Sequence, residues 1–189
     1  IPLSWGCRRP PPPKPTPSED QVKLQRLQHD MLAAGDENQR DWEALLHESE
    51  TVAKRLLVLT DGQDTHQAVD VYMCTEPEAE FECRFIHADD TIHTTEFPGR
   101  FVPVQLSPDT ALRVHCPDAA CPPTTFYLGD PVQMHDTGYE DVVTVPVSRE
   151  GVLSLPTLAP DTRYILFTLV RNPGEKMVRK YVWVMEKRQ

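Results

Sequence analysis

The hydrophobic residues of the chain follow two different spacings. From residue 18 to about residue 59 they recur at steps of three and four, which is the spacing of an amphipathic helix. From residue 68 onwards they alternate with polar residues in short runs separated by Pro, Gly and Asp, as in strands joined by turns. The pattern therefore predicts an α+β protein in which a helical segment precedes an all-β domain.

Two apolar stripes with a polar break between them make up the helical segment. Ser18 and Gln21 have the spacing of a capping box, so a helix should begin here. The break "AAGDEN" contains Gly35 and Asn38, which are poor helix formers. We expect two helices in a hairpin that turns at Gly35, the second over about 36–59; one long kinked helix is the alternative. The apolar residues of the stripes are Leu24, Leu27, Met31 and Leu32, then Trp42, Leu45, Leu46, Val52, Ala53, Leu56 and Leu57.

The β region contains about nine strand candidates. Because no helical pattern intervenes between them, they predict an antiparallel sandwich. The candidates are "AVDVYMCT", "EFECRFIHA", "RFVPVQLS", "ALRVHC", "TTFYLG", "DVVTVPV", "VLSLPTL", "RYILFTLVRN" and "RKYVWVME".

The closing strand candidate is apolar on both faces. Tyr181, Trp183 and Met185 alternate on one face, and valines line the other. We expect the sandwich to bury the tryptophan face. The apolar stripe of residues 42–57 is then the expected cover of the valine face, which would join both halves of the chain into one unit.

A corner motif precedes one of the expected strands. Leu158, Pro160, Thr162 and Tyr164 form a Leu-x-Pro-x-Thr-x-Tyr pattern. A tyrosine at such a corner can bury its ring between the sheets while its hydroxyl bonds to the backbone just upstream. Over residues 103–186 the chain resembles fibronectin type III domains, which implies an immunoglobulin-like sandwich that binds or spaces other molecules. The segment "ALRVHC" lacks the tryptophan expected on the second strand of that family, which leaves other immunoglobulin-like sandwiches open.

Prolines dominate the start of the chain. The stretch "RRPPPPKPTP" at residues 8–17 restricts the backbone φ angle and removes most N–H donors, so it predicts an extended polyproline II arm without internal hydrogen bonds. We therefore expect three segments: a proline-rich arm over 1–17, a helical segment over 18–60 and an all-β sandwich domain over 61–189.

The net charge of −10 is unevenly distributed. Residues 61–161 carry 18 acidic and four basic residues, whereas both ends of the chain are basic. The basic ends reflect either solubility or contact with an acidic neighbour. An acidic chain disfavours non-specific attraction to nucleic acid, and no apolar run approaches the roughly 18 residues that span a bilayer. We expect neither a nucleic-acid partner nor a membrane span.

Five cysteines leave at least one unpaired within the chain. Cys74 and Cys83 flank an expected hairpin turn, and Cys116 and Cys121 flank "PDAA". These pairs form either two local disulfides, with Cys7 left over, or free structural thiols. Neither spacing matches the CxxC pattern of zinc sites.

Motifs of the familiar enzymes are missing from the sequence. It contains no Gly-rich phosphate loop, nucleotide fingerprint, HExxH or GxSxG. His115 and Cys116 are neighbours on an expected strand, so their side chains point to opposite faces and form no thiol–base pair. We expect no catalytic site, no cofactor and no metal.

An extended proline arm favours a role in binding other proteins, because a polyproline II segment loses little conformational entropy on docking. We expect a non-catalytic accessory or scaffold subunit that binds the other subunits of an assembly through its arm and helices. The residues expected at these contacts are Arg8, Arg9, Pro10, Pro11, Pro12, Pro13, Lys14, Pro15, Leu24, Leu27, Met31 and Trp42.

Two other functions fit the same pattern. One is an extracellular adhesion or receptor-like module with a proline-rich stalk; the other is an adaptor whose arm is bound by SH3 or WW domains. Because the sequence begins with Ile1 rather than Met, we expect that the chain is processed, renumbered or cut from a longer one, and that any presequence has been removed. This expectation favours an organelle, the mitochondrion first, with secretion as the alternative.

Overall fold

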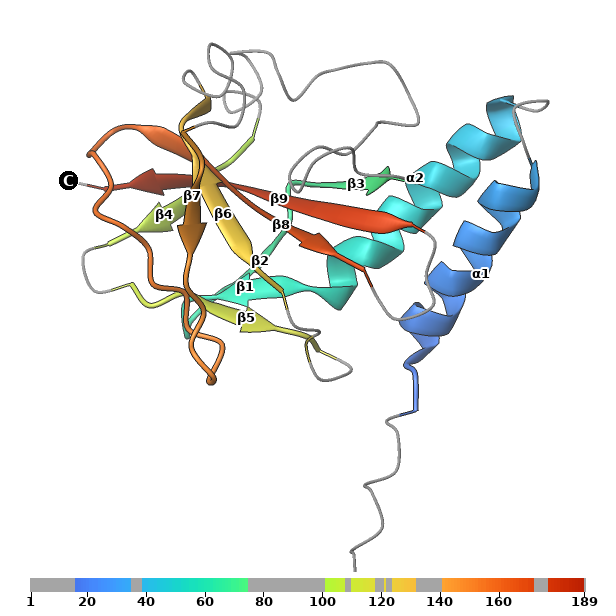
Figure 1. The fold of residues 1–189 in the computed structure, drawn as a ribbon, viewed down its shortest axis with the longest axis horizontal. Helices are drawn as coiled ribbons and strands as arrows, with labels where there is room; N and C mark the ends of the chain where they lie inside the picture. Colours follow the sequence, from blue (N-terminus) through green and yellow to red (C-terminus); the bar gives the residue numbers. More distant parts are fainter. Residues whose placement is uncertain are drawn as a thin grey trace, which may run out of the picture.

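Two helices and nine strands make up the described residues of the computed structural model (Figure 1). The structure describes residues 16–34, 39–74, 101–107, 110–117, 121, 124–131, 141–171 and 177–188. The helices are α1 (Glu19–Ala34) and α2 (Gln39–Leu56). The strands are β1 (Val58–Thr60), β2 (Thr65–Gln67), β3 (Asp70–Cys74), β4 (Val104–Leu106), β5 (Arg113–His115), β6 (Phe126–Gly129), β7 (Val143–Val145), β8 (Arg163–Val170) and β9 (Val178–Lys187).

The strands form two sheets, which confirms the α+β class and is consistent with a β-sandwich. The smaller sheet has the antiparallel order β2-β1-β5, and the larger has the order β3-β9-β8-β6-β7. Strand β4 also joins the larger sheet, where it runs parallel to the end of β9. The long strand β9 therefore holds β3 and β4 along one side and β8 along the other.

Helix α1 begins as the sequence predicts. The Ser18 hydroxyl accepts a hydrogen bond from Gln21 N at 3.2 Å, and the Gln21 side chain accepts one from Ser18 N at 3.0 Å, so both partners of the capping box are in place. The two predicted helices are confirmed, and they lie side by side at one end of the molecule (Figure 1). The expected turn at Gly35 lies outside the described residues.

Ion pairs show that the two helices run antiparallel. Asp20, in the first turn of α1, accepts two hydrogen bonds from Arg55, in the last turn of α2, at 2.9 and 2.7 Å. Further along, Lys23 lies 2.6 Å from Glu48. The start of α1 and the end of α2 are therefore held together.

The boundary between helix and sheet lies earlier than the sequence predicts. Helix α2 ends at Leu56 rather than at about residue 59, and residues 58–60 form strand β1. Val58 and Leu59 are almost fully buried. They belong to a strand that pairs with β2 and β5, and they do not continue α2 by another helical turn. The all-β part thus begins three residues before the predicted boundary at residue 61.

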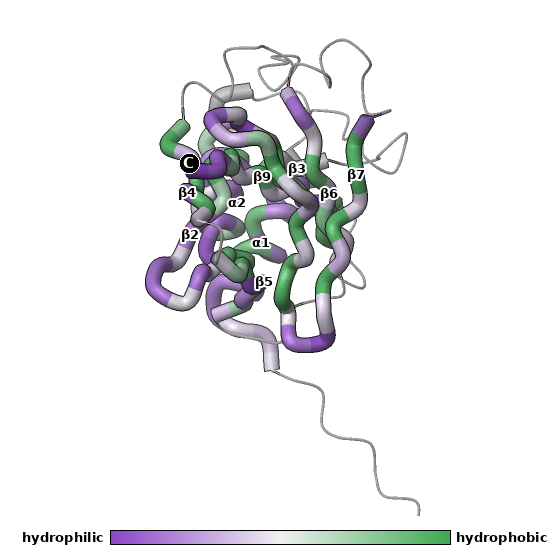
Figure 2. The backbone as a smooth tube through the Cα atoms, turned by 90° about the vertical axis from the view of Figure 1, so that its left-hand side faces the viewer, coloured by the Kyte–Doolittle hydropathy of each residue, from purple (hydrophilic) through white to green (hydrophobic). Residues whose placement is uncertain are grey.

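One hydrophobic core joins both helices to both sheets. The cluster contains Leu24 of α1, Val52 of α2, Leu59 of β1 and Trp183 of β9. Hydrophobic positions occur along the strands, and the described turns at the ends of the molecule are hydrophilic (Figure 2). The two helices therefore share one hydrophobic core with both sheets.

Trp183 lies at the centre of this core and is fully buried. Its ring centroid is 6.0 Å from that of Phe126 on β6. Its indole nitrogen donates a hydrogen bond to the carbonyl oxygen of His66 on β2 at 3.1 Å, so the larger sheet is tied to the smaller one. The expectation that the sandwich buries the tryptophan face of the closing strand is confirmed.

The expected cover of the opposite face was wrong. The second apolar face of the larger sheet, with Ile165, Phe167, Val182 and Val184, forms its own buried cluster. Helix α2 instead contributes to the cluster that contains Trp183. The reason is that the smaller sheet has only short strands. The helices therefore pack beside it, on the face of the larger sheet that carries Trp183.

Most described strand candidates form strands, with one exception. The segment "VLSLPTL" makes isolated bridges, Arg113 to Val152 and Val147 to Leu153, and no continuous ladder. Pro156 supplies no N–H donor, which limits pairing beyond these bridges. The candidate "EFECRFIHA" lies outside the described residues.

Gln28 gives a test of the helix packing. Its side chain is 5% exposed between Leu24 and Met31 of α1, and its Nε2 has no hydrogen-bond partner among the described residues. Gln28→Met keeps the length of the side chain and removes the buried polar group, so we expect a gain of about 1 kcal/mol in the free energy of unfolding, measured by urea denaturation. Gln25→Met on the exposed face is the control, expected within about 0.5 kcal/mol of the parent. A loss of stability in Gln28→Met would show that the amide is satisfied.

Glu50 gives a test of the contact between α2 and β3. Burial, reinforced by the charge of Asp70, raises the pKa of its carboxyl to about 7, while Lys54 acts in the opposite direction. The native state therefore holds this proton more tightly than the unfolded chain, and stability should fall as the pH rises from 4.5 through 7. We expect Glu50→Gln to flatten this part of the curve of melting temperature against pH. Glu150→Gln, at an exposed position, should leave the slope unchanged; equal slopes in all three proteins would contradict the assignment.

Candidate functional site

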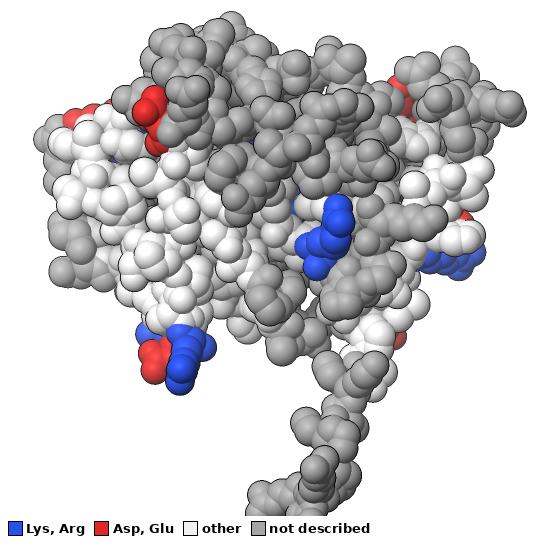
Figure 3. Space-filling model, viewed as in Figure 1, with Lys and Arg blue, Asp and Glu red and all other residues white. Residues whose placement is uncertain are grey.

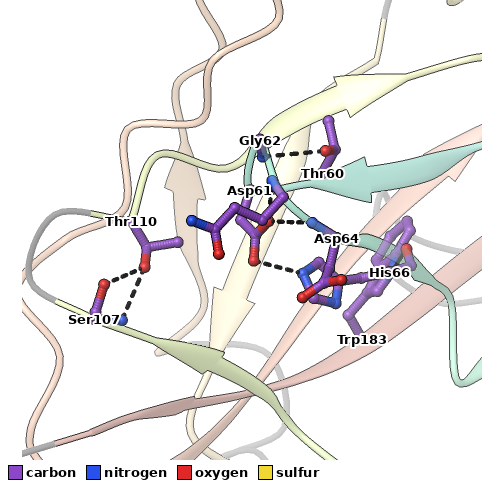
Figure 4. Close-up of polar contacts among 9 residues, drawn as sticks. Thr60, Asp61, Gly62, Asp64, His66, Ser107, Thr110 and Trp183 are labelled. Atoms are coloured by element: carbon purple, nitrogen blue, oxygen red, sulfur yellow. Dashed lines mark hydrogen bonds and ion pairs between the residues drawn. The ribbon is translucent and has the colours of Figure 1, made fainter.

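An open hollow lies between the β1–β2 hairpin and strand β4. It has a volume of about 770 Å³. One side comes from the hairpin and the other from residues 102–105, Ser107, Thr110 and Arg188, and Figure 4 shows Ser107 and Thr110 across from the hairpin. The lining residues are mostly polar: Asp61, Gln63, Asp64, Thr65, His66, Val102, Pro103, Val104, Gln105, Ser107, Thr110 and Arg188.

The hairpin side of the hollow is organised by one carboxylate. Asp61 Oδ1 accepts hydrogen bonds from Gln63 N at 2.9 Å and Asp64 N at 2.7 Å, and Gly62 supplies the positive φ of 93° that the turn requires. These backbone donors, with His66, lower the pKa of the Asp61 carboxyl to about 2. Asp61 is therefore an anion at neutral pH.

His66 connects this turn to the core. Its Nε2 lies 3.1 Å from Asp61 Oδ2, and its carbonyl oxygen accepts the indole N–H of Trp183. Asp61 and His66 are each about one-fifth exposed at the side chain. The wall of the hollow is thus held by bonds from both the turn and the core.

The opposite side contains hydroxyl and amide groups. Thr110 Oγ1 accepts a hydrogen bond from Ser107 N at 2.9 Å and lies 2.7 Å from Ser107 Oγ. The Gln105 side chain donates to Glu186 at 2.6 Å and accepts from Arg188 at 3.1 Å. These contacts fix the groups before any ligand binds.

The polar groups of the hollow form structural pairs. The Ser107 and Thr110 hydroxyls bond to each other, and the imidazole of His66 bonds to Asp61 (Figure 4). In these bonds neither hydroxyl is paired with the imidazole, which would be its base. Nucleophilic catalysis needs a hydroxyl within reach of its base. Within the described ranges, no three His, Cys, Asp or Glu side chains gather as a metal site. The arrangement is suited to binding through hydrogen bonds and charge.

A second, smaller hollow adjoins the first. It has a volume of about 440 Å³ and shares Ser107 and Thr110 with it. Its wall includes Leu106, Leu153 and Leu155. The polar hollow therefore continues into one with leucine side chains.

The structure places three of the predicted partner-binding residues inside the protein. Leu24, Leu27 and Met31 are at most 7% exposed and belong to the common core. Their expected role at a partner surface is corrected, because the apolar stripe of α1 is covered by this chain itself. Trp42 is half-buried and also packs against that core. The arm residues Arg8, Arg9, Pro10, Pro11, Pro12, Pro13, Lys14 and Pro15 lie outside the described residues.

Cys116 and Cys121 form a disulfide, with their Cα atoms 5.2 Å apart. It closes the segment between the end of β5 and the start of β6. Cys74 ends β3, whereas Cys83 and Cys7 lie outside the described residues, so the second pairing stays a prediction.

The corner motif adopts the expected geometry. The hydroxyl of Tyr164 accepts a hydrogen bond from Ala159 N at 3.1 Å, five residues upstream. The Thr162 hydroxyl donates to the Pro160 carbonyl at 3.4 Å, and Leu158 is buried. The corner thus fixes the entry into β8.

Sequence reasoning missed the hairpin that forms the hollow. The helix predicted over about 36–59 ends directly before residues 60–62, "TDG", but Asp-Gly is also a strong signal for a tight hairpin turn. Strands β1 and β2 have three residues each, too few for alternation to be recognised. The Asp-Gly pair was the one signal that could have located them.

Comparison of the chain with models of protein families, with curated protein sequences and with solved structures finds no match. Neither of the two described helices is long and apolar enough to cross a bilayer.

Asp61 gives a test of the hairpin geometry. Asp61→Asn keeps an oxygen for the two backbone N–H groups but loses the charge, so we expect a lower melting temperature at pH 7. Because the folded-state pKa is depressed to about 2, the advantage of the parent protein should be present above pH 3.8 and vanish as the pH falls through 2. Thermal unfolding followed by circular dichroism at several pH values measures this difference in melting temperature between the parent and Asp61→Asn. Asp64→Asn, at the exposed neighbour, is the control; a difference that persists in acid would contradict the role of the Asp61 charge.

Proposed function

We propose that this chain is a non-catalytic accessory or scaffold subunit of a larger protein assembly. The observation that carries the proposal is the single core shared by both helices and both sheets. Such a body has no internal hinge between helices and sandwich, so it can hold bound partners at fixed positions. The engaged hydroxyl and imidazole groups of the hollow support binding rather than catalysis.

The proline-rich arm is the first proposed contact. The capping box at Ser18 fixes where helix α1 starts, and hence where the arm joins the body. The arm carries Arg8, Arg9 and Lys14 and no acidic residue, so its complementary surface is acidic. The partner contact first assigned to α1 is replaced by the polar hollow, because the apolar stripe of α1 is buried.

We further propose that the sandwich is of the fibronectin type III kind. The order β7-β6-β8-β9 matches the order expected for strands C′, C, F and G of that family. The tyrosine corner before β8 supports the same assignment. One departure is that the core indole comes from the last strand, as Trp183, instead of the second.

The second candidate function is an extracellular adhesion or receptor-like module. The Cys116–Cys121 disulfide favours it, because disulfides persist in oxidising compartments. Alkylation of free thiols in the protein from its native source, followed by peptide mass spectrometry, tests this candidate: protected cysteines at positions 116 and 121 favour the extracellular module, and free thiols there favour the scaffold subunit. An organellar location, with the mitochondrion first, remains our proposal for the scaffold function.

A pulldown of the full-length chain beside a chain lacking residues 1–17 tests the scaffold function. We expect stoichiometric partner proteins with the full chain and their loss on deletion, as measured by mass spectrometry. The truncated chain keeps Ser18 and its cap, so its body should remain folded.

A charge-reversed arm serves as the matched control. Arg8→Glu, Arg9→Glu and Lys14→Glu together keep every proline, so loss of partners would assign recognition to charge, and retention would assign it to the polyproline shape. A monomer without partners in every case would overturn the scaffold proposal.

A further inference from the structure

Among the described strands, the hollow lies between two edge strands that belong to different sheets. Strand β2 ends the order of the smaller sheet, and β4 pairs with β9 alone among the described strands. Residues of both strands line the hollow. Unpaired sheet edges present backbone N–H and C=O groups that can pair with an added strand.

Backbone geometry identifies the open position of β4. The carbonyl of Leu106 accepts a hydrogen bond from Arg188 N, so the backbone of Leu106 faces the β9 side. Because backbone groups of successive residues in a strand point to opposite sides, those of Gln105 point away from β9. The Gln105 side chain is already bonded to Glu186 and Arg188, which holds this position in place.

Charge distinguishes the hairpin wall. Asp61 and Asp64 lie there together, whereas the β4 side contributes Arg188, whose Nε is bonded to Gln105. Asp64 is exposed, and the carboxylate of Asp61 is fixed by the turn. A cationic side chain beside these carboxylates would be attracted without moving the wall.

The adjoining smaller hollow sets a second requirement on any molecule that fills both hollows. It continues from the first through Ser107 and Thr110, and it contains Leu106, Leu153 and Leu155. An occupant of both hollows therefore needs to be elongated and to combine polar and apolar side chains. On the face shown in Figure 3, the charged side chains of the described residues are scattered singly or in small groups and form no extended patch.

We propose that the two hollows bind an extended segment of a partner protein, which adds to the free edge of β4. A Lys or Arg side chain of the segment lies beside Asp61 and Asp64, and an apolar side chain enters the smaller hollow. The proposal rests on the proposed function and names the chemistry of one partner contact. The chain's own proline arm is not the occupant, because prolines have no N–H to form a ladder.

Selection from a phage-displayed library of random peptides of about ten residues tests this inference on the full chain. We expect the enriched peptides to contain Lys or Arg together with β-branched or aromatic residues, and few prolines. Binding of a synthetic copy, measured by fluorescence anisotropy, should weaken about tenfold or more in Asp64→Lys. Glu150→Lys makes the same charge change at an exposed turn elsewhere and should leave affinity unchanged.

Amide hydrogen exchange measured by NMR tests the backbone pairing directly. The Gln105 amide should exchange more slowly when the selected peptide is bound. Failure to enrich peptides, enrichment without basic residues, equal binding by Asp64→Lys, or an unprotected Gln105 amide would each overturn the inference. The pulldown with the arm deletion is a separate experiment from peptide binding. Loss of arm-dependent partners with intact peptide binding supports both proposals. Peptide binding without any cellular partner overturns the scaffold function alone.

Discussion

The hydrogen bond from the Trp183 indole to the His66 carbonyl is the constraint on which the rest of the structure depends. A fully buried indole N–H needs an acceptor, and the acceptor it uses belongs to a strand of the other sheet. The bond therefore fixes how β2 lies over β9. Since α2 continues through β1 into this hairpin, the placement of the helices follows from the same contact.

The same residue carries this constraint to the surface. The His66 backbone is held by the core, while its ring is held by Asp61, which in turn organises the turn of the hairpin. The polar wall of the hollow is consequently rigid before anything binds. A preorganised wall reduces the conformational entropy that a bound peptide would otherwise cost.

Local signals in the sequence predicted local structure well. The Ser18–Gln21 box, the Tyr164 corner and the apolar alternation of β8 and β9 each depend on residues close in sequence, and each is present. An apolar stripe such as Leu24, Leu27 and Met31 specifies only that something must cover it. Here the cover comes from elements distant in sequence, so partner contact could not be told from internal packing. The hollow escaped prediction for the same reason, because it forms where two short edges from different sheets meet.

The antiparallel helix pair determines how mechanical load would enter this protein. Asp20 and Arg55 join the start of α1 to the end of α2, and α2 passes into β1 after a single residue. A force applied at Ser18, where α1 begins, would therefore act next to the sheet, not at the far tip of the helix pair. The shortest path for such a force into β1 would run through this ion pair and the last turn of α2, and the far ends of the two helices would lie outside that path.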